Sequence, residues 1–132
     1  MVIAIAGMIL SFVFVSVQDL KAKGRDSRRE EDIKQIQNAL GLYAVNTRLY
    51  PICETEVVIN GTSDCLSGAL VSAGAISGVP TDPLGRASGV CSDVASYVYC
   101  YESDDGFTYT LRHHLETNNI PGKAAGWHQV GP

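Results

Sequence analysis

Four cysteines are the residues whose chemistry is easiest to interpret in this chain of 132 residues. They are Cys53, Cys65, Cys91 and Cys100, and no two of them have the C-x-x-C spacing of a zinc ribbon or a thioredoxin-type site. An even number of cysteines in a small chain is typical of disulfides formed in an oxidising compartment. We predict the pairs Cys53–Cys65 and Cys91–Cys100. The other two connectivities stay open, because pairing depends on distances in space.

The remaining candidate chemistry is sparse, and it indicates that the protein is not an enzyme. The sequence contains no G-x-S-x-G, H-E-x-x-H, G-x-G-x-x-G or P-loop motif. His113 and His114 are adjacent in a predicted strand, so their side chains point to opposite faces and do not clamp one metal ion. We expect them to have surface or strand-packing roles. With the cysteines in disulfides, no obvious nucleophile is left, and we expect no cofactor.

The N-terminal segment is the element that most constrains function. Residues 1–17 carry no charged side chain, and Asp19 is the first charged residue. A helix of 17 residues spans about 26 Å, slightly less than the ~30 Å hydrocarbon core of a membrane. The segment lacks the polar stripe of a surface helix. A buried core helix and a secretory signal peptide are the alternatives, but no basic residue precedes the apolar run and no cleavage site with a loop follows it.

The helical pattern continues past this segment. Residues 18–34 are dense in mixed charge, and the next apolar residues recur every three or four positions: Ile33, Ile36, Leu40 and Tyr43. We predict one helix that ends near residue 46. Such a helix is about 68 Å long, far longer than a head of this size covers. We therefore expect residues 1–24 to protrude and residues 25–132 to form a globular head that includes the second half of the helix.

The rest of the sequence predicts a small α+β head. A short helix is expected over residues 65–73, with Ser63 or Asp64 as its cap, after an extended run at 57–59. Two segments with period-two alternation, 97–101 and 107–111, flank an Asp-Asp-Gly turn and predict a hairpin. Tyr97, Tyr99 and Tyr101 should share one face of the first strand, and Phe107, Tyr109 and Leu111 should share one face of the second. We expect the three tyrosines to pack on the long helix, with a surface adhesive patch as the alternative. The tail from residue 117 is rich in Gly, Asn and Pro, with Trp127 as its one large apolar anchor.

The charge distribution argues against a nucleic-acid partner. The net charge is -4. Six basic and five acidic residues lie at or before Lys34, whereas four basic and nine acidic residues follow it, which gives the second part 4 − 9 = −5. A head of this sign offers no general basic surface for a phosphate backbone.

Five motifs follow one another along the chain. The apolar start leads into Arg25-Asp26-Ser27-Arg28-Arg29. Next come D-I-x-x-I-Q-x-A-L-x-x-Y from Asp32 to Tyr43, Tyr50-Pro51, Val79-Pro80-Thr81-Asp82-Pro83, and Tyr97-x-Tyr99 with D-G-x-x-Y-x-L from Asp105. Their combination resembles the type IV pilin superfamily, which includes type IV pilins, type II secretion pseudopilins and competence pilins. The family's leader and its Thr-Leu-Ile-Glu start are absent, as is its mid-helix proline, so we expect the chain to begin a few residues inside the mature N-terminus.

The resemblance implies a structural subunit that polymerises into a surface filament. It implies an inner-membrane location before assembly, and a prepilin peptidase and pilus assembly machinery as partners besides identical subunits. The expected filament-core residues are Met1, Val2, Ile3, Ile5, Met8, Ile9, Leu10, Phe12, Val13, Phe14, Val15 and Val17. Charged residues after the apolar segment are candidates for membrane-interface contacts and for ion pairs between subunits: Arg25, Arg28, Arg29, Glu30, Glu31 and Asp32.

Two alternatives to this interpretation and one question about metal binding stay open. The first is a type II secretion major pseudopilin, which the sequence does not separate from a pilin. The second, from another class, is a membrane-anchored binding module that never polymerises. The question about metal is whether the chain binds calcium: the resemblance to major pseudopilins suggests a calcium ion held by Asp82, Asp93, Asp104 or Asp105. These residues lack EF-hand spacing, and aspartate is common in plain turns, so calcium is the weaker interpretation.

Overall fold

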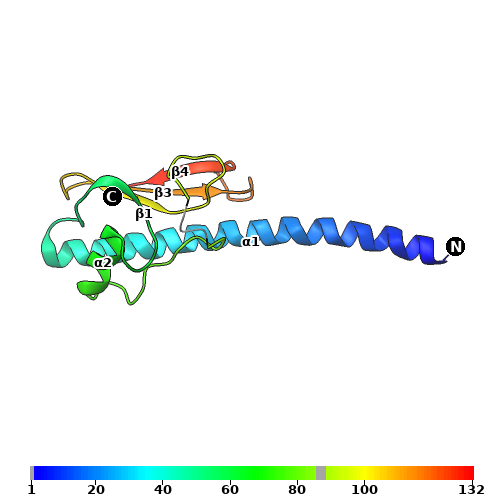
Figure 1. Ribbon diagram of the computed structural model, residues 1–132, viewed down its shortest axis with the longest axis horizontal. Helices are drawn as coiled ribbons and strands as arrows, with labels where there is room; N and C mark the ends of the chain where they lie inside the picture. Colours follow the sequence, from blue (N-terminus) through cyan, green and yellow to red (C-terminus); the bar gives the residue numbers. More distant parts are fainter. Residues whose placement is uncertain (1, 86–88) are drawn as a thin grey trace.

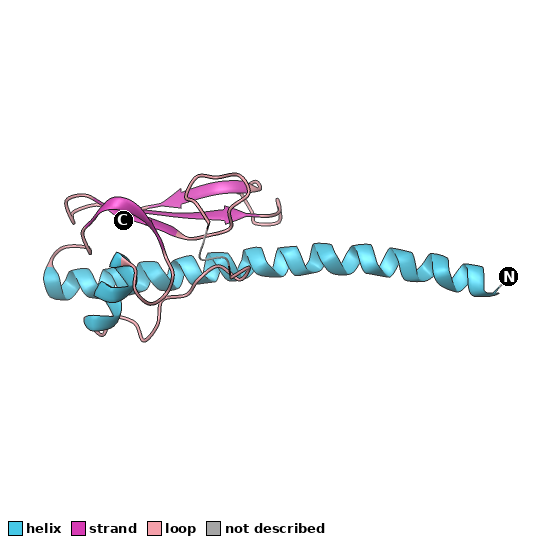
Figure 2. Cartoon of the chain, viewed as in Figure 1, coloured by secondary structure: helices cyan, strands magenta, loops and turns pink. Residues whose placement is uncertain are grey.

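One long helix and a four-stranded sheet form the α+β architecture of the computed structural model, which describes residues 2–85 and 89–132 (Figures 1 and 2). In chain order the elements are α1 (Val2–Thr47), β1 (Cys53–Val58), α2 (Cys65–Ser72), β2 (Cys100–Ser103), β3 (Thr110–Leu115) and β4 (Gly126–Val130). Met1, named above for the filament core, lies outside the described residues, as do the side chains of Phe12, Phe14 and Val15.

Helix α1 is continuous, because no proline interrupts it and both Gly7 and Gly24 are tolerated within it. It ends one residue beyond the predicted position. Arg48 adopts a left-handed backbone conformation with φ of 64° and donates its N–H to the carbonyl of Ala44 at 2.8 Å, which is a common way for a helix to stop. The N-terminal part of α1 extends well beyond the head (Figure 1).

The sheet is antiparallel in the order β1-β2-β3-β4. Its inner face packs on the second half of α1, and α2 lies against α1 and β1. The core combines helix and sheet side chains that are almost fully buried: Ile33, Ile36, Leu40, Leu66, Leu70, Tyr99, Tyr101 and Leu111. Fully burying an aliphatic side chain of this size is worth about 1.5–3 kcal/mol, so this contact holds the second half of α1 in the head.

Helix α2 and the two disulfides match the sequence-based prediction. Asp64 caps α2, and its carboxylate accepts a hydrogen bond from the backbone N–H of Ser67 at 2.9 Å. The bonds Cys53–Cys65 and Cys91–Cys100 are both present, each with a Cα–Cα distance of 6.1 Å. The first ties β1 to the start of α2, and the second ties the loop before β2 to the first residue of that strand.

The hairpin differs from the prediction in length. Residues 104–109 connect β2 to β3, and Phe107 is 71% exposed, whereas Tyr109 and Leu111, which we expected on the same strand face, are buried. The cause is local: the carboxylate of Asp105 accepts hydrogen bonds from the backbone N–H groups of Phe107 and Thr108, and Gly106 has a positive φ of 73°. The carbonyl of Gly106 accepts a hydrogen bond from the Tyr50 N–H at 2.7 Å. These bonds hold the connection as a broad loop.

The tyrosines of the first hairpin segment pack largely as predicted. Tyr99 and Tyr101 are fully buried, whereas Tyr97 is half-buried. The strand begins only at Cys100, so Tyr97 and Tyr99 precede it. The Tyr99 hydroxyl donates to Asp32 and the Tyr101 hydroxyl donates to the carbonyl of Pro51, both at 2.8 Å. Each buried polar tip therefore has a partner.

Strand β4 lies in the segment that the sequence indicated only as a tail. It pairs with β3 from Leu111↔Val130 to Leu115↔Gly126. Trp127 is the anchor that we expected, but it is held within a strand. The sheet therefore has four strands, and the carbonyl of Gly131, just after β4, accepts a hydrogen bond from the Gln37 amide of α1 at 3.4 Å.

Candidate functional site

The first half of α1 is an apolar surface that the head does not cover. Among the described residues, α1 is the one helix long and apolar enough to cross a membrane, and none of its most apolar stretch is buried within the chain. Val2 is 80% exposed and Ile3 is 89% exposed. The other exposed large apolar residues of this half are Ile5, Met8, Ile9, Leu10, Val13, Val17 and Leu20. Soluble monomers rarely expose a contiguous apolar surface of this extent, so it is the candidate contact surface of the chain.

The second half of α1 begins with a buried ion cluster centred on Arg29. The guanidinium of Arg29 is fully buried and forms a bidentate pair with Asp82, at 2.6 Å from Nε and 3.0 Å from Nη2. Its Nη1 donates to Asp26 at 2.8 Å and to Glu116 at 2.6 Å. The ring of Tyr97 lies 5.0 Å from the guanidinium carbon, so an aromatic face also covers the cation.

The carboxylates of the cluster are satisfied from several directions. Asp26 accepts hydrogen bonds from the backbone N–H of Glu116 at 2.9 Å and from the N–H and hydroxyl of Thr117, both at 2.7 Å. Glu116 also binds Arg25 through both of its oxygens, at 2.7 and 2.6 Å. The cluster thus joins α1 to the residues immediately after β3, and to Asp82 in the loop after α2.

The electrostatic balance keeps this cluster charged. Burial by itself would raise the pKa of Asp26, but hydrogen bonds from Glu116 and Thr117 and from Arg29 hold that pKa below its ordinary value. The hydrogen bond from Arg25 is the main cause that lowers the pKa of Glu116. Burial would lower the pKa of Arg29, and its bonds to Asp82 and Glu116 outweigh that effect and raise it. Removal of one member of a buried ion pair leaves an uncompensated buried charge, which strongly destabilises the fold.

A second polar contact lies beside the first. Glu30 accepts hydrogen bonds from Lys123 at 2.8 Å through each oxygen and lies 2.8 Å from Nε2 of His113. Burial raises the pKa of Glu30, but the bonds from Lys123 and His113 outweigh it, and the net pKa is lowered. Burial lowers the pKa of His113. Burial also raises the pKa of Asp32, against the opposing hydrogen bond from Tyr99.

The structure divides the six charged residues that the sequence suggested for contacts between subunits. Arg25, Arg29, Glu30 and Asp32 are engaged within the head, and Arg29 is fully buried. Arg28 and Glu31 are exposed on α1 and form no ion pair with any other described residue. A role between subunits therefore stays a prediction that only these last two are placed to fulfil.

The histidines lie on opposite faces of β3, as their adjacency predicts. His113 points toward α1 and Glu30, whereas His114 contacts the rings of Tyr97 and Trp127 edge-on, at centroid distances of 4.6 and 5.4 Å. Both are buried. They pack the strand on its two sides and do not converge on one point.

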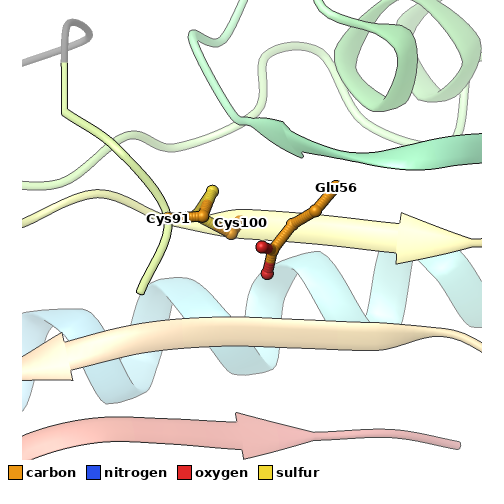
Figure 3. A group of neighbouring side chains, drawn as sticks. All are labelled: Glu56, Cys91 and Cys100. Carbon is orange, nitrogen blue, oxygen red and sulfur yellow. A yellow bond between two sulfur atoms is a disulfide. The ribbon is translucent and has the colours of Figure 1, made fainter. Parts of the chain in front are cut away.

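Two groups of potential metal ligands are placed by the structure. Glu56 lies beside Cys91 and Cys100 (Figure 3), but the two sulfur atoms are bonded to each other and Glu56 pairs with Arg112 at 3.1 Å. The calcium candidates come from two different loops, the one between α2 and β2 and the one between β2 and β3. Asp82 binds Arg29 near the end of β3, whereas Asp104 and Asp105 lie in the loop before the start of β3.

The remaining calcium candidate, Asp93, lies in the loop before β2, and its carboxylate accepts a hydrogen bond from the backbone N–H of Ala95 at 3.3 Å.

Comparison of the chain with protein-family models, with curated proteins and with solved structures finds no match. Functional interpretation therefore depends on three features of the chain: an uncovered apolar helix half, a buried ion cluster where it joins the head, and a disulfide-bonded head.

Proposed function

We propose that the chain is a pilin-like subunit of the type IV pilin superfamily, anchored in a membrane by the first half of α1 and able to polymerise into a surface filament. The observation that carries this proposal is the uncovered apolar half of α1, attached without a break to a small disulfide-bonded head. The order of elements, with the long helix first and the antiparallel sheet after it, supports the same interpretation.

The proposed mechanism is physical. The apolar side chains of residues 2–17 first contact lipid and later contact the same segment of neighbouring subunits. Eight large apolar side chains of the described part of this segment are exposed in the single chain. Burial of each is worth about 1.5–3 kcal/mol, which is ample to hold a fibre without covalent links. Repeated contacts between unlike surfaces of identical subunits produce an open helical assembly.

The ion cluster supports this role by fixing the helix to the head. Arg29 connects α1 to Asp82 and Glu116, which come from two separate segments of the head. Because these contacts are buried and satisfied, the helix axis has one orientation relative to the sheet. A filament requires that orientation to be the same in every subunit, since a repeated contact propagates any variation along the fibre.

Removal of detergent from the purified full-length chain tests the proposal. The expected product is a filament visible by electron microscopy, with the heads outside and α1 at the centre. A chain that reinserts into added lipid vesicles as a monomer, and forms no filament at any protein concentration, would instead identify a membrane-anchored module that does not polymerise.

A charge-reversed variant separates assembly from anchoring. We expect Arg28→Glu combined with Glu31→Lys to disturb filament packing, because both side chains are exposed on α1 just beyond the apolar segment. Insertion into vesicles should be unchanged, since neither residue belongs to that segment. Glu102→Lys, a charge reversal on β2, is the control for a general effect of charge. Normal filaments from the double variant would remove these two residues from the proposed contact.

A further inference from the structure

A hollow of about 250 Å³ lies on the face of the sheet that points away from α1. Its walls are Ser92, Arg112, Trp127, His128 and Gln129. Arg112 on β3 and Gln129 on β4 are partners in the strand register. Since His113 points toward α1, its neighbour Arg112 lies on the opposite face of the strand. The hollow is therefore formed by the outward-facing side chains of Arg112, Trp127 and Gln129 and by the loop before β2. His128, whose ring lies 5.8 Å from that of His113 on the other face, borders the hollow without pointing into it.

Trp127 forms a fixed wall of this hollow. Its Nε1 donates a hydrogen bond to the backbone carbonyl of Asp93 at 2.9 Å. The ring of His114 meets the indole edge-on at a centroid distance of 5.4 Å and an angle of 84°. An indole held at its nitrogen and by a neighbouring ring loses little freedom when a ligand stacks on it, which favours binding.

Arg112 is held in place but retains donors. Its Nη1 donates to the Ser92 hydroxyl at 3.0 Å and pairs with Glu56 at 3.1 Å. Its Nε and Nη2 donate no hydrogen bond to a described residue, and its side chain is 31% exposed. Ser92 has a positive φ of 70°, an uncommon conformation for a residue other than glycine, and the adjacent Cys91 is fixed by its disulfide to Cys100. Unusual backbone conformations of this kind cluster at ligand-binding positions.

We propose that this hollow binds one neutral pyranose unit, such as the terminal sugar of a glycan. The indole of Trp127 offers a flat apolar face for the C–H face of the ring. The free guanidinium donors of Arg112, with their fork geometry, and the amide of Gln129 lie around it and suit neighbouring hydroxyl groups. Pockets for drug-sized molecules occupy roughly 300–1,000 Å³, so this hollow suits a single ring.

The charges around the hollow favour a neutral sugar over an acidic one. Glu56 already pairs with the guanidinium of Arg112, so the site has no uncompensated cation from that residue. The chain after Lys34 carries four basic and nine acidic residues, 4 − 9 = −5, and so repels an anion at long range. A carboxylated sugar would find no uncompensated charge on Arg112 and would be repelled by the net negative charge, whereas the hydroxyl groups of a neutral sugar are not subject to either effect.

This inference goes beyond the proposed filament function and does not depend on it. Every residue of the hollow comes from the head of a single chain, and none belongs to the apolar half of α1. Sugar binding is therefore measurable on monomers in detergent, and its failure would leave filament formation untouched.

The test is an NMR titration of the full-length ¹⁵N-labelled chain in dodecylphosphocholine micelles, since a glucoside or maltoside detergent would compete. Glucose, galactose, mannose and N-acetylglucosamine are the neutral probes, and glucuronate is the charged probe. We expect at least one neutral sugar to shift the backbone signals of residues 92, 112 and 127–129 and the indole N–H signal of Trp127. A stronger response to glucuronate that weakens with salt would overturn the neutral class, and no localised shift at 50 millimolar sugar, roughly 50 times a millimolar dissociation constant, would overturn the site.

Matched variants sharpen the result. Gln129→Ala removes an exposed amide from the hollow, and we expect about fivefold weaker binding from the loss of one hydrogen bond. Gln35→Ala removes an exposed glutamine from α1 and should bind as the parent chain does. Trp127→Phe should weaken binding further while its spectrum shows whether the sheet is intact. Equal binding by the Gln129→Ala and Trp127→Phe variants and the parent chain, with intact spectra, would contradict the proposed site.

Discussion

Residues 2–24 and 25–47 belong to one unbroken helix, but their side chains meet different surroundings. In the first half, the large apolar side chains that the structure describes are exposed: Leu10 is 56% exposed and Val13 is 55% exposed. In the second half, Leu40 has no exposed surface and Arg29 is buried among three carboxylates. Helical backbone structure is therefore the same in both halves, whereas the contacts that stabilise each half differ. The second half obtains its stabilisation from the head, and for the first half we propose lipid or another copy of the chain as the partner.

Removal of the Arg29 side chain should have the largest effect. We expect Arg29→Ala to lower the free energy of unfolding of the head by about 3–5 kcal/mol, because three carboxylates lose their buried counter-charge. Urea unfolding of the full-length chain in micelles, followed by Trp127 fluorescence, measures the change. Arg28→Ala, one residue away and exposed, should change it by less than about 0.5 kcal/mol. Similar effects of the two substitutions would show that the cluster does not stabilise the head.

The same substitution in each half of α1 provides a matched comparison. Leu40→Ala should cost the head about 2–5 kcal/mol, because it leaves a cavity in the core. Leu10→Ala should leave the stability of the head within about 0.5 kcal/mol, since Leu10 has no contact with the core. Detergent-micelle unfolding measures both. A large loss of head stability from Leu10→Ala would contradict the division of the helix.

Loss of either disulfide should have the next largest effect. Changing both cysteines of one pair to serine should destabilise the head by about 2–4 kcal/mol, since each bond restricts a loop in the unfolded chain. The Cys91–Cys100 pair provides the sharper test, because the loop that it holds also contributes Ser92 to the hollow. Peptide mapping without reduction should recover both linked fragments from the parent chain. A fragment that links Cys53 to Cys91 or to Cys100 would refute the pairing.

Acid should weaken the head through the groups that join α1 to β3. The lowered pKa values of Asp26, Glu30 and Glu116 mean that their contribution is fully present above about pH 5 and is lost as the pH falls through their folded-state pKa values. Burial lowers the pKa of His113 as well, so its contribution disappears on acidification from about pH 6.5. The raised pKa of Asp32 acts in the opposite direction.

We expect a net loss of about 1–3 kcal/mol between pH 7 and pH 4, measured by urea unfolding in zwitterionic micelles. Glu116→Gln should flatten this dependence, because it removes one of the carboxylates that titrate. An equally steep pH dependence in that variant would assign the acid effect to other groups.

The parts of the fold that local patterns encode were predictable. The bounds of α1 follow from apolar spacing, and α2 follows from the position of its cap at Asp64. Strand β4 was not predicted, since Gly126–Val130 is short and follows a segment rich in Gly, Asn and Pro. Its sequence, Gly-Trp-His-Gln-Val, has no period-two alternation of apolar and polar residues that would indicate a strand.

The ion cluster could not be predicted from local sequence patterns, for a different reason. Arg29 lies 53 residues from Asp82 and 87 residues from Glu116 in the sequence, so only the tertiary fold brings them together. In the sequence it belongs to a charged stretch that also contains the exposed Arg28 and Glu31. Local composition therefore suggested the same role, contact between subunits, for the buried Arg29 and for the exposed Arg28 and Glu31. Phe107 shows the same limit, because its exposure depends on the hydrogen bonds of Asp105.

Photo-crosslinking from Val13 tests most directly whether the first half of α1 contacts other copies of the chain. Val13 is replaced by p-benzoylphenylalanine in the full-length chain, which is irradiated before and after removal of detergent. We expect a ladder of covalent multimers only after removal of detergent, and mass spectrometry of the products should find crosslinks between apolar segments. The same sample with a large excess of micelles is the control and should remain monomeric. Exclusively monomeric product after detergent removal, with the label attached to added lipid alone, would contradict the central claim.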